Sequence, residues 1–172
     1  MTHTDDWGEP RQRTVTWHDP EVLARSGAGL TGLEFMQAIS DGRLPMPPIA
    51  SLFDMRGDEV AEGRISFRCT PHESAYNPIG AVHGGLVCTL LDSVLGCAVH
   101  TTLPAGFGYT SIEIKVSYLR GVTVRSGELL AVGRVTKPGR RVAFAEGEVT
   151  DASGRTVATG SSSLLVFPLE GS

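Results

Sequence analysis

The residues best suited to chemistry lie in a glycine-rich loop and in the apolar segment that follows it. Residues 77–85 read NPIGAVHGG, and Asp92 comes seven residues after the last of these glycines. Glycines where a loop enters a helix let a substrate approach the backbone N–H groups, toward which the positive end of the helix dipole also points. Gly84 and Gly85 therefore predict a site for a developing oxyanion. The alternative is that they only permit a tight loop.

Asp92 interrupts an otherwise apolar segment, between Leu91 and Val94. Asp is unfavourable in the middle of a helix, and an unpaired buried carboxylate is costly, so the residue requires an explanation. Burial would make the carboxylate a stronger general base. The alternative without a catalytic role is a solvated or hydrogen-bonded carboxylate on a small polar stripe with Thr89 and Ser93. The residues alone leave both interpretations open.

The spacing of these residues limits how they could act together. Gly85 and Asp92 share a helix face, but seven residues place them about 10 Å apart along the axis. If both act on one carbonyl group, one of them must come from a second subunit. Asn77 precedes a proline, where its usual role is to shape a turn. Its alternative role is to donate a hydrogen bond to an attacking water or to the substrate.

The elements that must position these residues follow from the hydropathy pattern. Residues 84–100 predict a helix that is apolar on nearly every face, which is typical of a buried helix. Two strands, 51–56 and 59–69 around a turn at Gly57-Asp58, are expected before it. Four more, at 109–119, 127–136, 140–151 and 155–166, are expected after it. Their short links indicate antiparallel neighbours, so the predicted class is α+β, with about six antiparallel strands wrapped around one long buried helix.

The remaining segments suggest a simple organisation. Residues 1–48 are interpreted as an N-terminal extension that carries a short amphipathic helix, with a helix start at Asp19-Pro20 and an end near Gly42. Residues 49–167 form the main domain, and residues 168–172 a C-terminal tail.

Composition excludes several functional classes. The 172 residues are 41% hydrophobic and 20% charged, with a net charge of −4, which argues against a nucleic-acid partner. No apolar run approaches the roughly 18 residues of a membrane helix, and no signal peptide is evident. The three cysteines and the histidines lack ligand spacing, so no metal site is expected. A cytoplasmic protein with reduced thiols and no membrane partner is predicted.

The composite pattern of Asn77, Gly80, His83-Gly84-Gly85 and Asp92 resembles the signature of hotdog-fold thioesterases. It is most similar to the phenylacetate-degradation (PaaI-like) branch of the 4-hydroxybenzoyl-CoA thioesterase superfamily, and the resemblance covers residues 49–167. It implies a hotdog fold, homodimers with a continuous sheet or homotetramers, and active sites at the dimer interface. The implied activity is hydrolysis of an acyl- or aryl-acyl-CoA thioester to the free acid and CoA. No cofactor is implied, since coenzyme A is part of the substrate.

The same resemblance implies a role for each residue of the motif. Asp92 would act as general base or nucleophile, and the Gly84 N–H would polarise the thioester carbonyl across the dimer interface. Asn77 would orient water or thioester, His83 would support the loop, and Ser111 would assist the water. A non-catalytic acyl-CoA-binding or sensing protein on the same fold is the alternative.

The CoA phosphates would need cations. Arg120 ends a strand where relatives often read Leu-Arg-Pro, but Gly121 replaces that proline and leaves the local turn in doubt. Residues 137–141 (KPGRR) form a positively charged turn suited to phosphate, or else a solvated hairpin tip. The candidate substrate contacts are Gly85, Thr110, Arg120, Lys137, Gly139, Arg140 and Arg141.

Overall fold

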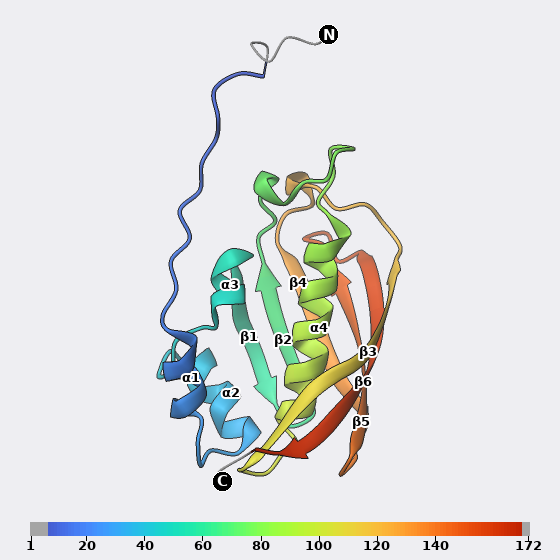
Figure 1. Cartoon of the computed structure of the whole chain (residues 1–172). Helices are drawn as coiled ribbons and strands as arrows, with labels where there is room; N and C mark the ends of the chain where they lie inside the picture. The colour runs from blue at the N-terminus through green and yellow to red at the C-terminus, as the bar shows by residue number, and fades with distance from the viewer. Residues whose placement is uncertain (1–6, 170–172) are drawn as a thin grey trace.

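The computed structural model describes residues 7–169 and contains one six-stranded antiparallel sheet that curves around a long helix, α4 (Gly84–His100) (Figure 1). The predicted fold, including the bounds of this helix, is confirmed. The strands lie in the order β1-β2-β4-β5-β6-β3. Their bounds are Met55–Ala61 for β1, Arg64–Cys69 for β2, Phe107–Tyr118 for β3, Leu129–Lys137 for β4, Val142–Thr150 for β5 and Thr156–Pro168 for β6.

Helix α4 supplies one side of the core. Leu90, Leu91, Val94 and Leu95 are fully buried against the sheet. The sequence predicts a helix that is apolar on nearly every face, but the face of α4 opposite the sheet is partly polar. Asp92 is exposed and its neighbours on this face, Cys88, Thr89 and Ser93, are only half-buried, because the sheet of one chain covers only one side of the helix. The polar-stripe interpretation of Asp92 therefore describes this chain, and the expectation of a buried carboxylate is wrong for it.

Three short helices precede the sheet and lie beside β1 (Figure 1). They are α1 (Pro20–Ser26), α2 (Gly32–Ser40) and α3 (Pro48–Leu52). The Asp19 side chain caps α1, and Thr31 and Glu34 form a capping box on α2. The expected single helix is thus two helices. Gly32 allows α2 to approach α4 closely, because a Cβ there would lie 1.8 Å from the His100 carbonyl oxygen.

The first hairpin corrects two predictions. Residues 51–52 belong to α3 rather than to a strand, and the turn falls after β1, where Gly63 has a φ of +71°. Gly57-Asp58, the expected turn, lies inside β1 at a bulge. The Asp58 carboxylate accepts hydrogen bonds from Ser66 Oγ (2.8 Å) and Arg68 Nε (2.6 Å) on β2. These bonds across the strands hold the dipeptide in the sheet.

Strand β3 lies at one edge of the sheet and pairs only with β6. Its register shifts after Ser111, so that Ile112 is an extra residue in the strand. Side chains alternate between the two faces of a strand, and a bulge reverses the phase of that alternation. Tyr109 before the shift and Ile114 and Val116 after it consequently all pack on the core side.

The helices of residues 7–169 are all too short or too polar to span a membrane. Residues 1–6 and 170–172, the outermost parts of the expected extension and tail, lie outside the described residues.

Candidate active site

Asp92 and Ser111 form a hydrogen-bonded pair between the middle of α4 and the edge strand β3. Ser111 Oγ donates to Asp92 Oδ1 at 2.7 Å. The bulge at Ile112 allows Ser111 to share the helix-facing side of β3 with the core residues that follow it. Both side chains belong to exposed residues. The pair is therefore a carboxylate with one fixed hydrogen-bond donor that solvent or a substrate can still reach.

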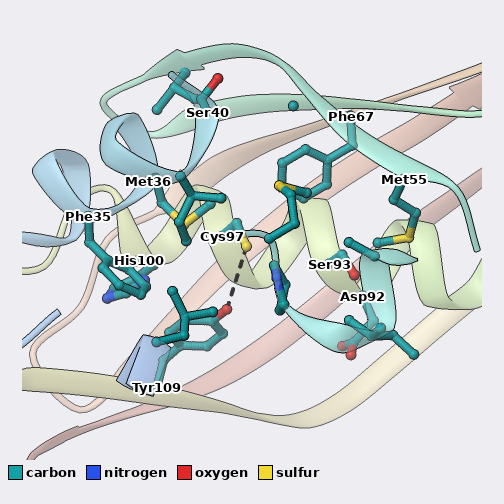
Figure 2. A pocket seen from close by; sticks show the side chains of 18 of the residues that line it. Phe35, Met36, Ser40, Met55, Phe67, Asp92, Ser93, Cys97, His100 and Tyr109 are labelled. Carbon is teal, nitrogen blue, oxygen red and sulfur yellow. Dashed lines mark hydrogen bonds between the residues drawn. The ribbon is translucent and has the colours of Figure 1, made fainter. Parts of the chain in front are cut away.

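An apolar cavity of about 280 Å³ extends from this pair (Figure 2). Asp92, Ser93 and Ser111 lie at one end, and His100 is two helical turns further along α4, about 12 Å away at ~1.5 Å per residue. The walls come from α2, α3, β1, β2, α4 and β3, and they include Phe35, Met36, Met55, Phe67, Cys97 and Tyr109. An apolar cavity with a few polar groups at one end is typical of a small-molecule site.

The titratable groups deeper in the cavity are uncharged at neutral pH. Cys97 Sγ and Tyr109 Oη lie 3.8 Å apart (Figure 2). Burial raises the pKa of the Cys97 thiol to about 11 and raises the pKa of Tyr109 well above its usual value. Burial also lowers the pKa of His100. Asp92 is the one acidic or basic side chain among the others that line the cavity.

The start of α4 is organised by the loop before it. His83 Nδ1 accepts a hydrogen bond from the Gly85 N–H at 2.8 Å, so this donor is occupied. Gly84 is the first residue of the helix, and its N–H has no acceptor within the helix. Asn77 Oδ1 accepts hydrogen bonds from the N–H groups of Ile79 and Ala81, each at 3.1 Å. Asn77 and His83 therefore shape the loop in this chain, and Asp92 lies eight positions after Gly84.

Tyr118 is a site residue that the sequence reasoning missed. Its hydroxyl donates to the Gly84 carbonyl oxygen at 3.0 Å, and its ring would lie 3.1 Å from a Cβ placed on Gly84. Tyr118 lies on the same face of β3 as Ile114 and Val116, because all three follow the bulge at Ile112 by an even number of residues. Its orientation thus depends on a bulge that the alternation pattern of the sequence did not indicate.

The expected CoA contacts form two separate groups in one chain. Arg120 donates to the Thr156 carbonyl oxygen at 2.5 Å, near the start of α4. The turn of residues 138–141 precedes β5, whereas Thr156 follows the end of that strand. Because β5 is about 27 Å long at ~3.4 Å per residue, the two groups lie far apart in one chain. At the turn, Lys137 Nζ lies 5.9 Å from the centre of the Phe144 ring, and Arg140 and Arg141 are exposed.

Three further residues expected to contact the substrate are Gly139, Thr110 and Gly85. Gly139 permits its tight turn, since a Cβ would lie 1.9 Å from the Val142 carbonyl oxygen. Thr110 is exposed and alternates to the face of β3 away from Asp92, and Gly85 lies in the first turn of α4. Within residues 7–169, no group of three or more His, Cys, Asp or Glu side chains is arranged to hold a metal ion.

Comparisons with known proteins give a consistent result. A family model described as the thioesterase superfamily matches residues 79–158. A Halobacterium salinarum protein, provisionally named an esterase, is 32% identical over 130 residues, which cover 69% of this chain and 84% of that protein. Human acyl-coenzyme A thioesterase 13 is 28% identical over 102 residues, covering 59% and 71%. A solved Ralstonia eutropha structure, provisionally described as a phenylacetic acid degradation-related thioesterase, matches with a TM-score of 0.69 at 26% identity, covering 75% and 97%.

Proposed function

This chain belongs to the thioesterase superfamily and is a thioester hydrolase, and we propose that it hydrolyses acyl-CoA thioesters at the Asp92–Ser111 pair. The observation that carries this proposal is a carboxylate, hydrogen-bonded to a hydroxyl, at the accessible end of an apolar cavity. The cavity accepts the acyl group and leaves the thioester carbonyl beside the pair. The relative named for acyl-CoA hydrolysis supports CoA as the thiol portion.

Hydrolysis then requires two proton transfers, one from water to Asp92 and one from Asp92 to the leaving sulfur. Asp92 takes a proton from a water molecule whose oxygen attacks the carbonyl carbon. The tetrahedral intermediate collapses, the C–S bond breaks, and the CoA sulfur receives the proton as the acid is released. Ser111 holds Asp92 in position and can also orient the water, because its hydroxyl can accept a hydrogen bond while donating one.

The carbonyl oxygen gains negative charge in the intermediate and needs a donor. The N–H of Gly84, at the positive end of α4, is suited to this role. Gly84 of the same chain is about 12 Å along the helix from Asp92. We therefore assign the donor to Gly84 of a partner subunit, with Asn77 and His83 holding the loop that presents it.

The edge strand β3 is the surface through which two copies would associate. It is twelve residues long, pairs with β6 on one side only, and exposes Ile112 to 56%. Long, unprotected edge strands are ready partners for another strand. Pairing of β3 with its copy would continue the sheet and cover the exposed face of α4 beside Asp92. Arg120, Lys137, Arg140 and Arg141 remain the candidates for the CoA phosphates, with Gly139 shaping their turn.

The test measures CoA release from a panel of acyl-CoAs by a thiol reagent. Asp92→Asn should lower kcat about 100- to 10,000-fold, the usual contribution of a general base. Ser111→Ala should lower it about tenfold, as expected for loss of one hydrogen bond to a charged group. Glu113→Gln and Ser117→Ala are the matched controls on β3. Glu113 accepts from Ser163, and both controls face away from Asp92.

Two outcomes would change the assignment. Full activity of Asp92→Asn would remove Asp92 from the mechanism. Tight binding of acyl-CoA by the wild type without CoA release would favour the acyl-CoA-binding alternative. Label in Asp92 after a single turnover in oxygen-18 water would identify a covalent intermediate hydrolysed at its Asp92 carbonyl, because a general base forms no bond to the oxygen of water.

A further inference from the structure

The end of the cavity away from Asp92 is closed by three aromatic rings from three different elements. Phe35 comes from α2, His100 from the end of α4, and Tyr109 from β3 (Figure 2). The ring centroids of Phe35 and His100 are 5.6 Å apart, and those of His100 and Tyr109 are 5.4 Å apart. These three residues are called the ring partition below.

A second hollow lies on the other side of the ring partition. It is an open groove of about 920 Å³, bounded by the α1–α2 connection, the start of β3 and the chain near Leu169. Among the residues that line the cavity and those that line the groove, only Phe35, His100 and Tyr109 are shared. The partition is therefore what separates the two spaces.

Each ring is pressed against a glycine backbone. A Cβ on Gly27 would lie 2.7 Å from the Phe35 ring, and one on Gly96 would lie 2.5 Å from the Tyr109 ring. A Cβ on Gly32 would lie 2.8 Å from Cδ2 of His100. The rings thus fill the space between α1, α2 and α4 to the limit that the backbone allows, and they cannot move toward these glycines.

We propose that the ring partition sets the maximum length of the acyl group. The inference rests on the proposed function, in which the acyl group enters the cavity with its thioester at Asp92. A cavity of about 280 Å³ is nearly twice the size of one of about 150 Å³ that holds benzene. It therefore suits an arylacetyl or medium-length acyl group. A longer chain must displace Phe35 before it can reach the groove.

Phe35 is the member of the partition that can be removed with least disturbance. It belongs to α2, outside the sheet, and packs on Gly27 just after α1, whereas Tyr109 belongs to the sheet and packs on Gly96 within α4, and His100 is the last residue of α4. Phe35→Ala would join the cavity to the groove. Each additional buried methylene is worth about fourfold in binding, so the gain should grow with every carbon that passes the former partition.

The experiment compares saturated acyl-CoAs from acetyl- to palmitoyl-CoA with the wild type, Phe35→Ala and Phe53→Ala. In the wild type, kcat/KM should rise with length, reach a maximum at medium length and then fall. In Phe35→Ala the maximum should move to longer chains, with palmitoyl-CoA improved at least tenfold over the wild type. Phe53 is half-buried, as Phe35 is, and packs on the core but does not line the cavity, so its variant should keep the wild-type profile.

Binding of octanoate and palmitate by calorimetry gives a second readout that needs no hydrolysis. Palmitate affinity should rise at least tenfold in Phe35→Ala, and Phe35→Leu provides a milder variant if the alanine protein does not fold. A wild type that hydrolyses palmitoyl- and octanoyl-CoA equally well would overturn the proposal, as would a folded Phe35 variant with unchanged profile and affinities. If no acyl-CoA is hydrolysed but the fatty-acid affinities shift as expected, the proposed function fails and the length limit stands.

Discussion

At the start of α4, the backbone N–H groups of the neighbouring Gly84 and Gly85 differ in whether they already have an acceptor. The Gly85 N–H is taken by His83 Nδ1, whereas the Gly84 N–H points out of the helix end without an intrahelical acceptor. A donor that is already satisfied cannot stabilise a developing charge without losing its first bond. Gly84 is therefore the better oxyanion donor of the two.

A proline at position 84 tests this role directly, since it removes the N–H at the helix position where proline is best tolerated. His83 already has the extended conformation that a residue before proline prefers. Gly84→Pro should lower kcat about 100- to 1,000-fold, as does loss of other oxyanion donors. Gly84→Ala adds a Cβ against Tyr118 but keeps the N–H, so it should lose far less activity. Equal losses in the two variants would indicate crowding by Tyr118 instead.

Residue identity alone could predict the chemistry of Asp92 but not its surroundings. Ser111 was expected near Asp92 from a resemblance, and its hydroxyl does contact the carboxylate. The side chain of Asn77, by contrast, is occupied by its own loop, as its position before proline had suggested. Tyr118 could not be placed on the helix side of β3, because that depends on the register shift after Ser111.

At the scale of elements, α4 was the most predictable part of the fold. A loop with turn residues precedes it, and a long apolar run continues to His100, where Pro104 and glycines follow. The hairpin of β1 and β2 was less predictable. Its Gly57-Asp58 pair has the composition of a turn, yet Asp58 is held by Ser66 and Arg68 of the neighbouring strand. Contacts between strands outweighed a local turn preference.

The packing of α2 on the end of α4 should make stability depend on pH. Burial lowers the pKa of His100 below its ordinary value of 6.5, so the unfolded chain binds a proton more readily than the folded chain. The stabilisation from neutral His100 is then present above about pH 6.5 and is lost as the pH falls below it. A single proton limits the slope to about 1.4 kcal/mol per pH unit.

Denaturant unfolding between pH 7.5 and 5.5 measures this effect. The wild type should lose stability over this range, and His100→Gln should lose less. His18→Gln, which removes an exposed histidine, should follow the wild type. The same pH dependence in His100→Gln as in the wild type would show that His100 is not the responsible group.

At the scale of the whole molecule, the proposed dimer predicts rescue between two inactive variants. A heterodimer of Asp92→Asn and Gly84→Pro has one site in which both groups are wild type, and one site in which both are altered. Random mixing makes about half of the dimers mixed, each with half of its sites intact, so about a quarter of wild-type activity should return. Mixing after unfolding and refolding, with the mass of each species checked by light scattering, provides the measurement. If the two groups act within one chain, mixing restores nothing.

The fold was predictable from sequence at this scale, but the cavity was not. Alternating strands and one apolar helix indicate the sheet and its contents. The cavity, however, is bounded by side chains from residue 23 to residue 111 that belong to separate elements. Its length depends on how closely α2 approaches α4 at Gly32, which is a property of tertiary packing.

The shift of register in β3 has a consequence for how this protein can change over generations. Upstream of Ile112 the strand contributes Tyr109 and Ser111 to the cavity, and downstream it contributes Ile114 and Val116 to the core. The first pair has odd residue numbers and the second pair even ones, yet the extra residue Ile112 places all four side chains on the same face of the strand. Substitutions in the first half can therefore retune substrate preference while the second half preserves folding. If Ile112 were paired in regular alternation instead of bulged, Glu113 would turn inward, so this single shift of register links the inheritance of chemistry to that of structure.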